Sequence, residues 1–201
     1  MSVLGELQPN KVFKYFEEIC SIPHGSRNLQ QISDYLVDFA KAHELKYRQD
    51  EDLNVIIWKD GSKGYEASEP VILQGHMDMV AVKEADCDKD MEKEGLDLEI
   101  NGDYISAKGT SLGGDDGIAV AYTLAVLDDE EMAHPPIEAI FTVNEEIGML
   151  GAATIDVSDL KGRLFMNMDS EDEGVFTVSC AGGASVICKI PYETETVNAS
   201  V

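Results

Sequence analysis

The chain has 201 residues, 44% of them hydrophobic, which is enough for one large domain with a buried core, or for a domain and a fragment. Its 39 acidic and 15 basic residues give a net charge of −24, which argues against a nucleic-acid-binding protein and against docking on an anionic membrane. No apolar run approaches the roughly 18 residues of a membrane-spanning helix, so no membrane partner is expected.

The cysteines and the N-terminus bear on the compartment. The four cysteines are scattered without CxxC spacing, at Cys20, Cys87, Cys180 and Cys188. They predict reduced thiols rather than a disulfide framework or a zinc knuckle. The first ten residues lack the basic-then-apolar pattern of a secretion signal. We therefore expect a cytoplasmic protein.

The N-terminal part of the chain predicts two helices and a strand. Apolar side chains recur at a helical period in residues 9–20 and again in residues 28–44. His24 lies in the loop between these helices and is expected to be an ordinary loop histidine. Residues 53–58 then have the composition of a strand.

The next predicted strand ends in a histidine and an aspartate. Residues 71–80 begin with a short apolar run, typical of a buried strand, and continue into His76 and Asp78. Residues two apart in an extended chain share a face. The imidazole of His76 could bind a metal, and Asp78 could hold its other ring nitrogen. The alternative is a core histidine followed by a capping aspartate.

A glycine-rich loop carries two adjacent carboxylates. Asn101 and Gly102 predict a tight hairpin, and residues 109–117 then contain Asp115 and Asp116 immediately before an apolar helix at 118–127. A helix N-terminus favours negative charge, and a cation between the two acids would let them lie together more easily. The alternative is one N-capping aspartate with a solvated neighbour.

Two later strands also end in acidic residues. The predicted strand at 137–143 leads to Glu145 and Glu146, and the one at 163–168 leads to Asp169. Two adjacent glutamates allow one to bind a metal while the other remains free as a base. In an α/β sheet, ligands bind beyond the carboxyl ends of the strands. We therefore predict an α/β fold, a three-layer sandwich with a mostly parallel sheet, and a metal site at this edge.

The expected ligands narrow the choice of metal. One histidine with several carboxylates suits zinc, manganese or cobalt in a hydrolase better than a structural zinc, which favours cysteine. A carboxylate that bridges two such ions would hold them roughly 3.5–4 Å apart.

Four segments together resemble a known family. Residues 75–80, 113–117, 144–148 and 167–171 follow the order and spacing of the M20-type metallopeptidases, and they are most similar to the aminoacyl-histidine dipeptidases. The resemblance extends from about residue 8 to 190. It implies a zinc-exopeptidase-like catalytic domain with two zinc ions, for which Mn²⁺ or Co²⁺ could substitute.

The resemblance also implies a role for each residue. The implied metal ligands are His76, Asp115, Glu146 and Asp169. Asp115 would bridge the two ions, and the peptide bond after it would be cis. Asp78 would orient His76, and Glu145 would be the general base. The implied substrates are unblocked dipeptides, with Xaa-His dipeptides such as carnosine preferred, and the full-length protein would be a homodimer.

Two alternatives for the function remain. One is another M20-like amidohydrolase, such as a tripeptidase, aminoacylase or deacylase. The other is a non-catalytic metal-binding or interaction module that kept the fold.

The chain departs from the family in length. Family members are more than twice as long, with a lid or dimerisation domain followed by a segment that supplies a last metal-binding histidine. Here no histidine follows His134. We therefore expect residues 1–190 to be the N-terminal part of an incomplete catalytic domain. Residues 191–201 would begin the connection to the missing domain.

Overall fold

The computed structural model describes residues 2–170, 174–179, 182–184 and 186–194. It divides into two compact units, residues 1–169 and 170–201. The described residues of the second unit form no helix or strand. The expected domain boundary at 190 stays a prediction, and residues 195–201 of the expected connection lie outside the described residues.

The first unit contains helices, a mixed sheet and a separate hairpin. The helices are α1 (Asn10–Cys20), α2 (Gln30–Ala42), α3 (Gly114–Leu127) and the short α4 (Leu150–Thr154). The main sheet has the order β1-β2-β6-β3-β7, with strands β1 (Lys46–Gln49), β2 (Val55–Lys59), β3 (Val71–His76), β6 (Ile137–Thr142) and β7 (Leu164–Asn167). The sequence analysis missed β1.

The strand pairings make this a mixed sheet, with two parallel and two antiparallel pairs. Strand β3 is parallel to both of its neighbours, β6 and β7, whereas β2 is antiparallel to β1 and β6. Among the described strands of this sheet, β2 alone therefore runs against the others. The carboxyl ends of β3, β6 and β7 meet at one edge, as the α/β prediction requires.

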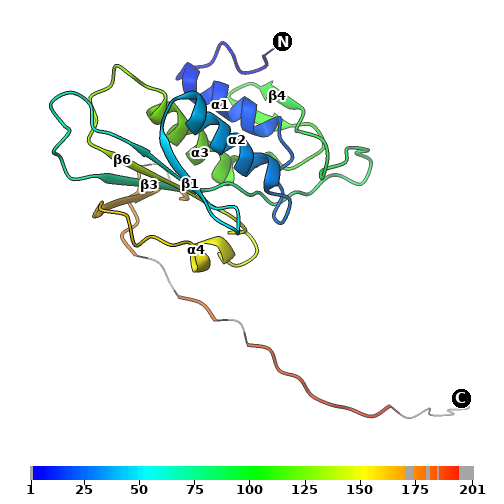
Figure 1. The fold of residues 1–201 in the computed structure, drawn as a ribbon. Coiled ribbons are helices and arrows are strands. Elements are labelled where there is room, and N and C mark those ends of the chain that lie inside the picture. The colour runs from blue at the N-terminus through cyan, green and yellow to red at the C-terminus, as the bar shows by residue number, and fades with distance from the viewer. Residues whose placement is uncertain (1, 171–173, 180–181, 185, 195–201) are drawn as a thin grey trace, which may run out of the picture. The chain divides into compact units, whose positions relative to one another are not determined.

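Most of the core lies between the sheet and the larger helices. Figure 1 shows α1, α2 and α3 on one side of the sheet and α4 on the other. Phe16 of α1, Leu124 of α3 and Phe141 of β6 are fully buried in the same apolar cluster. The other face carries a smaller cluster of Ile56, Ile72 and Ile140. Two layers are thus well packed, while the third is thin.

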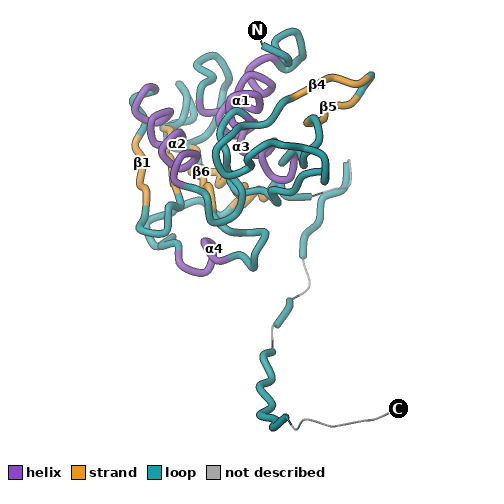
Figure 2. The backbone as a smooth tube through the Cα atoms, turned by 90° about the vertical axis from the view of Figure 1, so that its right-hand side faces the viewer, coloured by secondary structure: helices purple, strands orange, loops and turns teal. Residues whose placement is uncertain are grey.

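The hairpin is formed by β4 (Leu98–Asn101) and β5 (Tyr104–Ala107). It lies apart from the main sheet, on the side of the helices (Figure 2). Asn101 pairs with Tyr104, so the turn consists of Gly102 and Asp103, one residue later than the sequence predicted. Gly102 has a φ of +64°, which glycine adopts without strain. Within the described part of the chain, no helix has both the length and the apolar character needed to cross a membrane.

Candidate metal centre

His76 lies at the centre of a group of acidic side chains. It is the last residue of β3, and its side chain is only 1% exposed. Its Nε2 atom lies 3.0 Å from Asp115 Oδ1. The same nitrogen lies 3.9 Å from Glu145 Oε2 and 3.9 Å from Asp169 Oδ2. Four segments far apart in the sequence therefore bring their side chains close together.

Two groups of side chains have the spacing of metal ligands. His76, Asp115 and Glu146 have ligand atoms that all lie within 4.8 Å of one another, and so do His76, Glu145 and Asp169. All four predicted ligands are thus brought together. Imidazole and carboxylate oxygen form a donor set that fits zinc, manganese or cobalt. Glu145 lies within the same reach, so its assignment as a base rather than a ligand stays a prediction, as does the bridging role of Asp115.

The two adjacent aspartates differ in their exposure to solvent. The Asp115 side chain is 67% exposed and faces His76, while Asp116 is only 2% exposed and accepts the backbone N–H of His76 at 3.1 Å. The peptide bond between them is cis, as the resemblance implied. Just before them, Gly113 has a φ of +68°, and a Cβ there would lie 2.8 Å from Met79 Sδ. This glycine therefore lets the loop pass close to the segment after β3.

The main chain of Asp78 orients the imidazole of His76. The Nδ1 atom lies 2.9 Å from the Asp78 carbonyl oxygen and 3.6 Å from Asp78 Oδ1. A carbonyl oxygen only accepts hydrogen bonds, so Nδ1 carries the proton and donates it. In the neutral ring, the lone pair of Nε2 then points toward the acids, which is the tautomer that binds a metal there.

The charges of the site shift several pKa values. Burial lowers the pKa of His76, but its hydrogen bonds with Asp78 and Asp115 and the negative charges of Asp116 and Asp78 outweigh burial and raise the pKa to about 10. Burial raises the pKa of Asp116 to about 7. The pKa values of Glu145 and Glu146 are also raised, first by burial and then by the neighbouring acids. A bound cation would relieve this repulsion.

The structure adds contacts that sequence reasoning missed. Asp78 is 1% exposed, and its Oδ2 atom accepts a hydrogen bond from Ser26 Oγ at 2.8 Å. Its Oδ1 atom accepts one from the backbone N–H of Glu145 at 3.0 Å. Nothing in the sequence pattern marks Ser26, because it lies in a loop 52 positions before Asp78.

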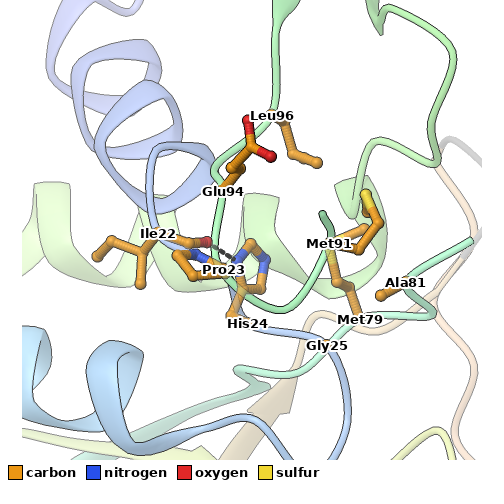
Figure 3. A pocket seen from close by; sticks show the side chains of 9 residues that line it. All are labelled: Ile22, Pro23, His24, Gly25, Met79, Ala81, Met91, Glu94 and Leu96. Atoms are coloured by element: carbon orange, nitrogen blue, oxygen red, sulfur yellow. Dashed lines mark hydrogen bonds between the residues drawn. The ribbon is translucent and has the colours of Figure 1, made fainter. Parts of the chain in front are cut away.

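Two cavities lie beside this loop. Figure 3 shows the smaller one, into which the buried His24 projects with its Nδ1 bonded to the Ile22 carbonyl oxygen. His24 is in a loop, as expected, but it is only 2% exposed. The larger cavity, of about 930 Å³, lies between residues 25–28 and residues 81–93.

The chain was compared with known proteins. No protein-family model matches it. It is 39% identical over 199 residues to the cytosol non-specific dipeptidase of Escherichia coli (strain K12), a match that covers 99% of this chain and 41% of that protein. The chain therefore spans about two-fifths of the length of this relative.

Solved structures give a consistent result. The crystal structure of aminoacylhistidine dipeptidase from Vibrio alginolyticus matches with a TM-score of 0.82 and 40% identity, over 85% of this chain and 35% of that one. A tripeptidase from Staphylococcus aureus matches with a TM-score of 0.68 and 23% identity, over 84% of this chain and 45% of that one. The second match supports the fold alone.

Proposed function

We propose that this chain forms the metal-binding part of a metallo-dipeptidase. Its similarity over 99% of its length to a cytosol non-specific dipeptidase supports the proposal, as does its resemblance to the M20-type metallopeptidases. The observation that carries the proposal is the convergence of His76 with Asp115, Glu145 and Asp169 beyond the carboxyl ends of the parallel strands. Solvated acids without a shared task would not be expected to favour that single edge.

The proposed cofactor is a pair of zinc ions, for which manganese or cobalt could substitute. His76, Asp115, Glu146 and Asp169 would hold them, and Asp115 would bridge. When bound, the ions would supply Lewis-acid activation of water and of the substrate carbonyl. The raised pKa of His76 supports the proposal, because the neighbouring carboxylates favour a positive charge at this position.

Glu145 is proposed as the general base. It would take a proton from the attacking water and deliver it to the leaving amine of the cleaved peptide. Burial and the neighbouring acids raise its pKa, which brings it closer to the pH at which a carboxylate exchanges protons efficiently. Asp78 would position Glu145 and His76, because it accepts hydrogen bonds from the Glu145 backbone N–H and from His76 Nδ1.

The names of the relatives support a proposal for the substrate class. We propose unblocked dipeptides as substrates, with Xaa-His dipeptides preferred, in the cytoplasm and in a homodimeric full-length protein. Another M20-like amidohydrolase, such as a tripeptidase, aminoacylase or deacylase, is the nearest alternative. A non-catalytic metal-binding module is the alternative from another class.

Zinc stoichiometry tests the metal site directly. The purified chain would be equilibrated with zinc, dialysed and weighed by native mass spectrometry. We expect two retained ions. A chain that is folded but retains none would contradict the proposed site.

Turnover tests the reaction. The chain would replace the matching 199 residues of the E. coli dipeptidase, and hydrolysis of carnosine would be compared with hydrolysis of N-acetyl amino acids. Zinc-dependent cleavage of carnosine supports the dipeptidase. Cleavage of the acetylated substrates alone would favour an aminoacylase, and a folded, zinc-loaded chimera without turnover would favour the module.

A further inference from the structure

We infer that the loop at residues 23–28 is part of the active site. Ser26 of this loop and Asn144, which bonds to it, act as positioning residues that fix Glu145 relative to His76. This inference rests on the function proposed above. The loop precedes α2 and contributes none of the predicted ligands. It bonds instead to Asp78 and Asn144, which lie next to the proposed base.

The first connection runs through Asp78. Ser26 Oγ donates to one carboxylate oxygen of Asp78, and the backbone N–H of Glu145 donates to the other. Asp78 is nearly fully buried, so water does not compete for these oxygens. A buried carboxylate needs such donors, because each missing one leaves charge unsolvated. One side chain therefore ties the loop to the segment that carries the proposed base.

The second connection runs through Asn144. Its Oδ1 atom accepts the backbone N–H of Arg27 at 2.8 Å. Asn144 has a φ of +53°, a left-handed conformation that asparagine tolerates better than most residues. It directly precedes Glu145. Two successive loop residues, Ser26 and Arg27, thus bond to the immediate surroundings of the base.

The loop itself is held firmly. The backbone N–H of Ser26 donates to the Met79 carbonyl oxygen, and that of Met79 donates to the His24 carbonyl oxygen, both at 3.2 Å. A Cβ on Gly25 would lie 2.6 Å from Ala81 Cβ, so the two segments are in close contact. Figure 3 shows His24 and Gly25 beside Met79 and Ala81. The Ser26 hydroxyl is therefore presented from a fixed backbone.

Removal of the hydroxyl has a specific consequence. Without Ser26 Oγ, the Asp78 carboxylate loses one of its donors and is free to turn toward His76 Nδ1, which lies 3.6 Å from Oδ1. The Glu145 amide then loses its fixed acceptor. Partners that orient metal ligands and catalytic groups commonly contribute about 10- to 100-fold to affinity or activity.

Amide hydrogen exchange tests this inference without metal or substrate. Exchange at the Glu145 amide would be measured by NMR on the 201-residue chain, for the wild type, Ser26→Ala and Ser26→Thr. We expect about tenfold faster exchange in Ser26→Ala, because the Glu145 amide loses a fixed hydrogen-bond acceptor, and a rate near that of the wild type in Ser26→Thr, which keeps the hydroxyl. Ser62→Ala is a matched control, because the half-buried Ser62 hydroxyl bonds to His134 far from Asp78.

Asn144→Gly tests the second connection. Glycine adopts the same positive φ but removes the acceptor, so we expect faster exchange at the Arg27 amide with the fold retained. Unchanged Glu145 exchange in folded Ser26→Ala, or equally faster exchange in Ser62→Ala, would overturn the inference.

Kinetics in the chimera with the E. coli dipeptidase distinguish a failure of the positioning role from a failure of the proposed dipeptidase function. We expect Ser26→Ala to lower kcat about tenfold with little change in KM, because the base is displaced while substrate binding is kept. An unchanged kcat would refute the positioning role in catalysis. Faster exchange together with an inactive, zinc-loaded wild-type chimera would refute the proposed dipeptidase and leave the structural link intact.

Discussion

His76 Nε2 and Asp115 Oδ1 lie 3.0 Å apart, although the two residues are separated by 39 positions in the chain. One ends β3, and the other lies in the first turn of α3. Their exposure differs sharply, with side chains 1% and 67% exposed, respectively. The imidazole of His76 is therefore buried, while the carboxylate of Asp115 is open to solvent. A cation can reach the site from the side of Asp115.

The first prediction concerns Asp115. In Asp115→Ala the carboxylate that faces His76 is lost, so we expect the chain to retain fewer than two zinc ions after dialysis. Native mass spectrometry would count them. Asp103→Ala, an exposed acid in the β4–β5 turn, is the matched control and should bind zinc like the wild type. Equal zinc content in both variants would exclude Asp115 as a ligand.

The second prediction concerns pH. The pKa of His76 is raised to about 10, so at neutral pH the metal-free ring carries a proton that zinc must displace. Raising the pH removes this competitor. We expect apparent zinc affinity to rise about tenfold per pH unit between pH 6 and 8, as competition with a chromophoric chelator would measure. A flat profile would show that His76 is not a ligand.

The same shift has a consequence for stability. A histidine whose pKa is raised by folding stabilises the fold fully below its ordinary value of 6.5, and this contribution is lost as the pH rises through about 10. Metal-free protein should therefore lose stability to urea between pH 8 and 10. His76→Gln should show a smaller loss over that range.

Sequence periodicity was sufficient to predict most elements of the fold. Apolar spacing placed α1 and α2, and the β-branched run placed β3, because burial of one face imposes these patterns. The short strand β1 was missed, since its residues Lys46–Gln49 are polar or exposed and carry no such pattern. The turn at Gly102 was shifted by one residue because a hairpin signal does not fix the register.

The site was predictable where chemistry requires particular residue types. The convergence of His76, Asp115 and Asp169 at one edge was predictable because each lies at or near the end of a recognisable element. Ser26 was not found, because a serine in a loop has many ordinary uses and its partner is distant in sequence. The orientation of His76 by the Asp78 carbonyl oxygen was also unpredictable, since every residue carries a carbonyl group.

The third prediction separates catalysis from metal binding. Glu145→Gln keeps the size of the side chain but removes its ability to accept a proton, so we expect turnover in the chimera to fall about 100- to 10,000-fold while both zinc ions are retained. A discontinuous hydrolysis assay would measure turnover, and native mass spectrometry on the same sample would count the retained zinc ions. Loss of zinc in Glu145→Gln would instead identify Glu145 as a ligand, which its 3.9 Å distance from His76 Nε2 makes a clear alternative outcome.

The last prediction concerns Gly75, which precedes His76 in β3. A Cβ at this position would lie 2.8 Å from Asp116 Oδ2 and 3.0 Å from Ala119 Cβ, so Gly75→Ala must push α3 away from the strand. We expect a loss of about 1–3 kcal/mol in the free energy of unfolding, measured with urea. The same shift moves Asp115 away from His76, so weaker zinc binding should accompany it. Gly182→Ala is the control and should change neither quantity, because no atom of the described residues lies within 4 Å of the added Cβ. Wild-type stability in Gly75→Ala would mean that α3 and β3 are less tightly packed than the structure shows.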